Sequence, residues 1–222
     1  MGLRSDFTAI FDFLFPEHLV CHCCGREAIV NEWGICEKCE KSLELCYSTQ
    51  LNKHLDGVRA GMLYQKGARK AIISLKFGGA LYKSEFFVHY MEIPDTWEFD
   101  YVVPVPLGER RFRKRGYNQS EVLAKGLCER YNLVMKTDAL IRIKNTAPQT
   151  QMSGASRAVN LKGAFKGTDE CEGKSFLLVD DVKTTGATLD SCAKELKRCG
   201  AVRVYAITAC AAAPMEKFNN NE

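Results

Sequence analysis

The stretch Phe176-Leu-Leu-Val-Asp180-Asp181-Val-Lys183-Thr184-Thr185-Gly186-Ala187-Thr188-Leu189 decides the fold. Its first four residues form a short, fully apolar run, which is typical of a buried parallel strand. Two acids follow, then a small, hydroxyl-rich loop and the start of a helical pattern. In an open sheet of parallel strands, ligands bind beyond the carboxyl ends of the strands. The sequence therefore predicts a binding site where this strand ends.

The loop after the two acids predicts an anion site. Backbone N–H groups at a helix N-terminus form a nest for negative charge, and threonine hydroxyls add further donors. The two carboxylates can accept hydrogen bonds from vicinal hydroxyls or help to hold a hydrated Mg²⁺. A sugar phosphate satisfies both halves, and an acidic helix N-terminus without a ligand is the alternative. The expected ligand contacts are Asp180, Asp181, Lys183, Thr184, Thr185, Gly186, Ala187 and Thr188.

On either side of this stretch, strand and helix patterns alternate from about residue 51 onward. We expect strands over 58–64, 101–105, 176–179 and 202–208, and helices over 68–75, 118–130 and 189–199. Such alternation is typical of parallel strands joined by crossover helices. The fold class is therefore α/β, with an open, mostly parallel sheet flanked by helices on both faces over residues 51–222.

The N-terminal part carries two C-x2-C pairs, and the four cysteines are Cys21, Cys24, Cys36 and Cys39. Four thiolates in two such turns suit the tetrahedral coordination of Zn²⁺. We expect a small zinc ribbon over residues 18–50 whose closed site is structural. His22 and Cys23 are competing donors for one position, and free buried cysteines are the other alternative. Apolar residues at helical spacing predict an amphipathic helix over residues 1–17.

Composition excludes several classes of protein. Of 222 residues, 46% are hydrophobic and 26% charged, which excludes wholesale disorder. No run approaches the ~20 apolar residues of a membrane span, and the N-terminus has no secretory signal pattern. We expect a soluble, cytoplasmic protein without membrane insertion, in which clustered cysteines bind metal rather than form disulfides. The absence of G-x-x-x-x-G-K-[ST] argues against ATP hydrolysis.

The net charge of +4 conceals a local concentration of positive charge. Cationic groups together with an aromatic face are typical of single-strand nucleic-acid binding, whereas a solvated basic face is the alternative. The candidates for nucleic-acid contact are Arg110, Arg111, Arg113, Lys114, Arg115 and Tyr117. Lys76, just before Gly78-Gly79, is a candidate anion contact, although a lysine that ends a glycine-capped helix explains it equally well.

The acid pair and the threonine loop resemble the phosphoribosyl pyrophosphate (PRPP) signature of type I phosphoribosyltransferases. Further motifs resemble those of the ComF family, whose members also have an N-terminal four-cysteine ribbon. These motifs are Asp100–Leu107 with Arg110–Gln119, Arg142–Phe165, and Leu75-Lys76-Phe77-Gly78-Gly79. The resemblance covers nearly the whole chain, with its motifs in the same order.

The resemblance implies a phosphoribosyltransferase-like fold that binds PRPP with Mg²⁺. It also implies a role in natural transformation (competence, the uptake of DNA), with single-stranded DNA as a partner. By analogy with that fold, the Pro104–Pro106 turn lies at the pyrophosphate loop, which makes Arg115 a candidate anion contact. Residues 145–157 align with the flexible lid of related transferases, and there Arg157 is a further candidate.

The resemblance leaves catalysis open. In purine-salvage relatives, an acid four residues after the first acid of the pair acts as a base, and here Thr184 stands at that position. Purine salvage is therefore disfavoured, and no catalytic residue can be named. The favoured hypothesis is a PRPP-binding competence protein that contacts single-stranded DNA. The alternatives are an active Mg²⁺-dependent phosphoribosyltransferase with an unidentified acceptor, and a PRPP-sensing adaptor for a DNA helicase.

Overall fold

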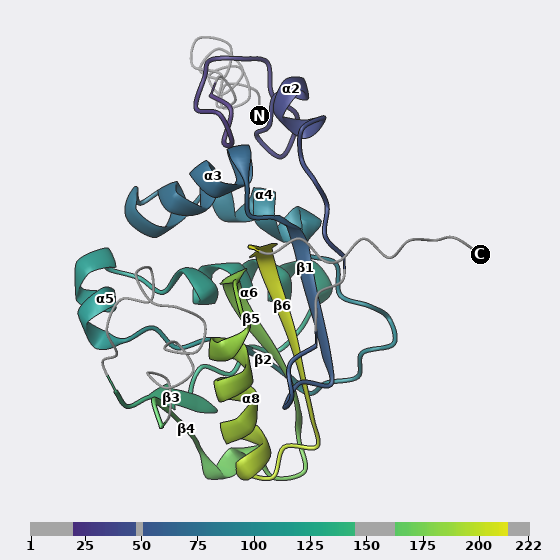
Figure 1. Ribbon diagram of the computed structural model, residues 1–222, viewed down its shortest axis with the longest axis vertical. Coiled ribbons are helices and arrows are strands. Elements are labelled where there is room, and N and C mark those ends of the chain that lie inside the picture. Colours follow the sequence, from purple (N-terminus) through teal and green to yellow (C-terminus); the bar gives the residue numbers. More distant parts are fainter. Residues whose placement is uncertain (1–19, 48–50, 145–162, 213–222) are drawn as a thin grey trace, which may run out of the picture.

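The computed structural model describes residues 20–47, 51–144 and 163–212. Its centre is a four-stranded parallel sheet in the order β1–β6–β5–β2 (Figure 1). The strands are β1 (Gly57–Leu63), β6 (Arg203–Ala211), β5 (Ser175–Lys183) and β2 (Tyr101–Pro104). The central strand β5 pairs with β6 on one side and with β2 on the other. The predicted open parallel sheet is thus confirmed.

Helices cover both faces of the sheet, as the alternation predicted. They are α3 (Lys66–Phe77), α4 (Lys83–Tyr90), α6 (Gln119–Tyr131) and α8 (Ala187–Arg198), while the short α5 (Glu109–Arg115) lies at the surface with no buried residue. On one face, Ile72 of α3 and Leu123 of α6 share a core with Leu177 of β5. On the other face, Leu196 of α8 packs in a second core with Phe176. Because β5 is buried on both faces, its apolar run shows no alternation.

β5 is longer than the sequence pattern predicted. Its apolar run ends at Val179, but the strand continues through the acid pair because β6 supplies backbone partners as far as Ala211, opposite Lys183. Asp180 and Asp181 are therefore strand residues, held by the sheet on which they lie, and the loop begins only after Lys183. This rigid backbone is a better platform for a binding site than a loop.

The sequence patterns did not predict α4, α5 or a two-stranded antiparallel sheet of β3 (Leu140–Arg142) and β4 (Phe165–Gly167). In α4 the consecutive Phe86, Phe87 and Val88 are all buried, so no one-sided apolar stripe marks the helix. In α5 no residue is buried, so the helix has no apolar periodicity at all. A short 3-10 turn, η2 (Asp169–Cys171), follows β4.

The N-terminal module, residues 20–47, lies against α3 and α4 (Figure 1). Antiparallel bridges join Val20 to Glu27 and Val30 to Cys36, and the short α2 (Glu37–Glu40) follows. Ile35 is fully buried in the core that also holds Ile72. The module and the sheet therefore share one apolar core.

Two predicted features, the helix over 1–17 and the lid over 145–157 with Arg157, lie outside the described residues. Among the helices that the structure describes, none is both long enough and apolar enough to cross a membrane.

Candidate ligand cavity and cysteine cluster

A cavity of about 920 Å³ lies at the carboxyl end of the parallel sheet. This volume lies within the usual range of small-molecule sites. Its walls come from the end of β5, the loop after β2, and helices α3, α5, α6 and α8. All eight residues that the sequence predicted to contact a sugar phosphate line it, together with Lys76 and Arg115. The chain thus brings these residues together from distant parts of the sequence.

The two acids at the floor of the cavity have different surroundings. Asp180 Oδ1 accepts hydrogen bonds from Ser120 Oγ at 2.8 Å and from the backbone N–H of Asp181 at 2.9 Å. Burial, followed by repulsion from Asp181, raises the pKa of Asp180 to about 7. The carboxylate of Asp180 is therefore easily protonated near neutral pH, and a cation or a hydroxyl donor in the cavity would favour its charged form.

Asp181 is 4% exposed and forms an ion pair with Lys76, whose Nζ lies 2.7 Å from Oδ1. The second oxygen, Oδ2, is buried and has no hydrogen-bond partner within the described part of the chain. A buried carboxylate oxygen without a donor is costly, and it is the kind of group that a metal ion or a ligand hydroxyl satisfies. Lys76, expected as an anion contact, is held by this ion pair.

The loop between β5 and α8 turns sharply at Gly186, which precedes the first residue of α8. Gly186 has φ +77°, and a Cβ there would lie 2.1 Å from Asn52 Oδ1. Asn52 Nδ2 in turn donates to Thr185 O at 3.1 Å, so this residue, distant in sequence, fixes the loop. Thr184 and Thr185 are exposed at the cavity, beside the N-terminus of α8.

The basic run forms α5, which ends at Gly116 in the left-handed conformation. The helix divides its cations between two directions. The four that line the cavity are Arg110, Arg111, Lys114 and Arg115. Arg113 does not line it and instead pairs with Glu109 on the exposed side of the helix. The structure therefore separates Arg113 from the other predicted nucleic-acid contacts.

The predicted aromatic contact, Tyr117, does not line the cavity, because its hydroxyl donates a hydrogen bond to Leu75 O at the end of α3. Phe77 takes that position instead. Its side chain is 61% exposed and lines the cavity, with the guanidinium carbon of Arg115 4.7 Å from its ring centroid. Arg115 also donates to Gln119 Oε1 at 2.5 Å.

The cavity residues that sequence reasoning did not name as ligand contacts include Arg69, Phe77, Ser120 and Arg142. Ser120 had a usable signal, because it follows Asn118, whose side chain caps α6 through the Ser120 N–H at 3.2 Å. This places Ser120 in the first turn of a helix that begins at the edge of the sheet. Arg69 had none, because an isolated arginine on α3 looks like any surface charge. Arg142 had only its place at the start of one motif of the resemblance.

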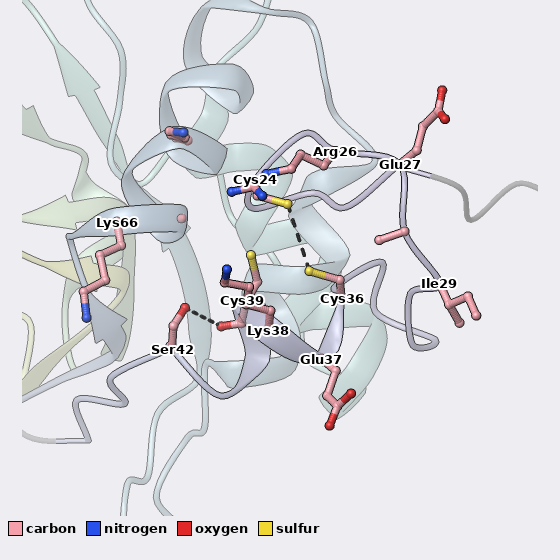
Figure 2. Close-up of a pocket in the computed structure, with 13 residues that line it drawn as sticks. Cys24, Arg26, Glu27, Ile29, Cys36, Glu37, Lys38, Cys39, Ser42 and Lys66 are labelled. Carbon is pink, nitrogen blue, oxygen red and sulfur yellow. Dashed lines mark hydrogen bonds between the residues drawn. The ribbon is translucent and has the colours of Figure 1, made fainter.

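The four predicted zinc ligands come together in the N-terminal module. The sulfur atoms of Cys21, Cys24, Cys36 and Cys39 all lie within 4.8 Å of one another, and Figure 2 shows the last three facing each other. Zn–S bonds of about 2.3 Å at tetrahedral angles require sulfur separations of about 3.8 Å. The separation of 4.0 Å between Cys24 Sγ and Cys36 Sγ agrees. The cluster fits a structural zinc ion.

The electrostatics of the cluster distinguish Cys21 from its neighbour Cys23. Burial opposes ionisation of Cys21, but N–H donors of Cys24, Cys36 and Cys23 outweigh it and lower its pKa to about 7. The Cys36 N–H lies 3.4 Å from Cys21 Sγ. Burial raises the pKa of Cys23 to about 12. Cys23 packs against Gly67 of α3 and His22 against Tyr82, so neither competing donor belongs to the cluster.

Comparison with known proteins agrees with this architecture. The model of a family described as the phosphoribosyl transferase domain matches residues 114–220. DNA utilization protein YhgH of Escherichia coli (strain K12) is 38% identical over 120 residues, covering 54% of this chain and 51% of that protein. Competence protein F of Haemophilus influenzae is 34% identical over 115 residues, covering 50% and 48%. The chain thus matches about half the length of these two relatives.

A longer match joins the chain to competence protein ComFC of Bacillus subtilis, at 27% identity over 182 residues. That match covers 79% of this chain and 70% of the relative. It reaches beyond the phosphoribosyl transferase domain match, which begins at residue 114. Residues 114–220 are thus similar to the phosphoribosyl transferase domain, and the chain as a whole is similar to proteins named for competence and DNA utilization.

Proposed function

We propose that the chain binds PRPP with Mg²⁺ in the cavity at the carboxyl end of the sheet, and that it acts in the cytoplasm on single-stranded DNA during DNA uptake. One observation carries the PRPP part: two carboxylates, a threonine loop at a helix N-terminus and the cations of α5 line a single cavity. The printed names of the relatives, which refer to DNA utilization and to competence, support the DNA part.

Each part of the cavity suits one part of PRPP. The N–H groups at the start of α8 and the hydroxyls of Thr184, Thr185 and Thr188 receive the 5′-phosphate. Asp180 and Asp181 accept hydrogen bonds from the ribose hydroxyls, which gives the unpartnered Oδ2 of Asp181 a donor. Mg²⁺, when bound, neutralises part of the pyrophosphate charge, and Arg115 with the other cations of α5 neutralises more of it.

Single-stranded DNA would contact the basic wall of the cavity, formed by the lining cations of α5: Arg110, Arg111, Lys114 and Arg115. Phosphate groups of the strand contact Arg110, Arg111 and Lys114, and this contact releases counterions and makes the affinity depend on salt. Arg113 points away from the cavity, towards Glu109. Arg111 and Arg113 therefore make a matched pair, because they have the same charge and lie on the same helix but face in different directions.

The PRPP proposal is tested by titration calorimetry with PRPP and Mg²⁺. Asp180→Asn is the informative variant, because it removes one cavity carboxylate and leaves the Lys76–Asp181 ion pair intact. We expect a loss of affinity of about 10- to 100-fold, the size of one or two lost charged hydrogen bonds. Asp169→Asn, at an exposed acid outside the cavity, is the control and should bind as wild type does. Equal affinity in all three proteins would refute the proposal.

The DNA proposal is tested by fluorescence anisotropy with a labelled oligo(dT) strand over a range of salt concentrations. Arg111→Ala should weaken binding and reduce the slope of log K against log salt by about one, because one phosphate contact is lost. Arg113→Ala should leave the slope unchanged. An equal effect of both substitutions would place the DNA on a different face of the molecule.

A further inference from the structure

We infer that PRPP and single-stranded DNA exclude each other, because the strand occupies the PRPP cavity itself and stacks a base on Phe77. This inference rests on the proposed function and adds the regulation of its site. From the sequence, the threonine loop and the basic run are two motifs about seventy residues apart. In the structure both line one cavity.

The charge of the cavity supports a shared site. Eight lysine and arginine side chains line it, against two carboxylates, Asp180 and Asp181. One of the eight, Lys76, is held by Asp181. The others line the same cavity from several elements, with Arg69 on α3 and Arg142 on β3 in addition to the cations of α5. A pyrophosphate group and a strand of DNA therefore draw on the same cations.

Phe77 gives the cavity a contact that DNA can use and PRPP cannot. Arg115 lies over the ring, 4.7 Å from its centroid, while 61% of the side chain remains exposed. An exposed ring backed by a guanidinium group is a stacking platform for a base. PRPP carries no base, so this platform favours a nucleotide unit of the strand. Tyr117, the aromatic residue expected for this role, has its hydroxyl bonded to Leu75 O and does not line the cavity.

Competition follows from the charge of the cavity. The lysine and arginine side chains that would neutralise the phosphate and pyrophosphate of PRPP are the same ones that a DNA backbone would contact there. Each ligand therefore lowers the affinity of the other by the same factor, as thermodynamic linkage requires. PRPP abundance would then control whether the chain holds or releases DNA.

The experiment measures the affinity for labelled oligo(dT) by anisotropy, with and without PRPP and Mg²⁺, at constant ionic strength. Ionic strength must be held because it changes DNA binding by itself. With PRPP at ten times its own dissociation constant, we expect the apparent dissociation constant for DNA to rise about elevenfold. Sodium chloride at matched ionic strength is the control and should leave the apparent dissociation constant for DNA unchanged.

Two substitutions locate the strand. Phe77→Ala should weaken oligo(dT) binding roughly tenfold or more, which is the scale of one lost base stack, and leave PRPP affinity within about twofold. Phe112→Ala removes an exposed ring on α5 that does not line the cavity, and it should change neither affinity. Phe77→Tyr retains an aromatic face and should retain DNA binding.

The outcomes separate this inference from the proposed function. If both ligands bind but PRPP does not alter the DNA affinity, or if Phe77→Ala binds DNA normally, the shared cavity is refuted while the proposed function stands. If calorimetry shows no PRPP binding at all, the proposed function and this inference fail together.

Discussion

The cysteine cluster and the ligand cavity are assembled in opposite ways. The four sulfur ligands lie within nineteen consecutive residues, from Cys21 to Cys39, and two tight turns bring them together. The cavity gathers residues from Tyr64 to Leu189, which only the parallel pairing of β5 with β2 and β6 brings to one edge. A local motif predicts its own geometry, whereas a site between elements depends on the topology of the chain.

The first prediction concerns the cluster and has the largest expected effect. Cys36→Ser should remove zinc and destabilise the whole chain, because the N-terminal module shares the core of α3 and α4. Structural zinc contributes about 10 kcal/mol or more in isolated zinc fingers, so a loss of several kcal/mol is expected here. Metal analysis and thermal unfolding measure the two effects.

Cys128→Ser is the matched control for this experiment. Cys128 lies half-buried on α6, outside the four-cysteine cluster. It should retain one zinc per chain and unfold close to the wild-type temperature. If Cys36→Ser retained its zinc, or if wild type contained none, the interpretation of the cluster as a metal site would be wrong.

The second prediction concerns the floor of the ligand cavity, where the ion pair between Lys76 and Asp181 stabilises the fold. Lys76→Met should destabilise the chain by about 3 kcal/mol, because it leaves Asp181 charged and buried without a partner. Asp181→Asn should cost less, because Lys76 is 20% exposed and can reach water. The double variant should be close to wild type. Urea unfolding of all four proteins gives the coupling energy, and additive losses would show that the ion pair contributes nothing.

The sequence predicted the cysteine cluster fully and the ligand cavity in part. The C-x2-C spacing gave all four sulfur ligands, because both turns are local. The apolar run of β5 located the end of the sheet and the threonine loop beside it. It did not reveal Phe77 or Arg142, because their roles depend on how α3 and β3 lie against β5. Nor did the sequence show that Tyr117 lies outside the cavity, since a hydrogen bond to Leu75, distant in sequence, decides where its ring lies.

The third prediction concerns the pH dependence that Asp180 gives to stability. Burial and Asp181 raise its pKa from 3.8 to about 7. The folded state therefore binds more protons than the unfolded state between these values, and this residue makes stability fall as pH rises from about 4 to 7. Asp180→Asn keeps an oxygen that accepts from Ser120 but has no charge to bury.

The free energy of unfolding of Asp180→Asn, relative to that of wild type, should therefore increase by about 1–3 kcal/mol between pH 4 and pH 7 and level off above pH 7. Urea unfolding at a series of pH values measures it. An advantage that is independent of pH would mean that the raised pKa is absent. A gain in stability together with a loss of PRPP affinity would show that the carboxylate is retained for binding.

The last prediction extends this contrast to the basic wall and has the smallest effect. The side chain of Arg111 forms no ion pair or hydrogen bond with any other described residue, and after burial its charge is the next cause that lowers the pKa of Arg142. Arg111→Ala should therefore raise the free energy of unfolding by a few tenths of a kcal/mol, since it relieves repulsion between like charges. Arg113→Ala should lower it by about 0.3–0.5 kcal/mol, because it breaks the exposed pair with Glu109. If the two substitutions change the free energy of unfolding in opposite directions, Arg113 stabilises the fold and Arg111 is available to a ligand. Changes in the same direction would mean that the orientation of α5 has no such consequence.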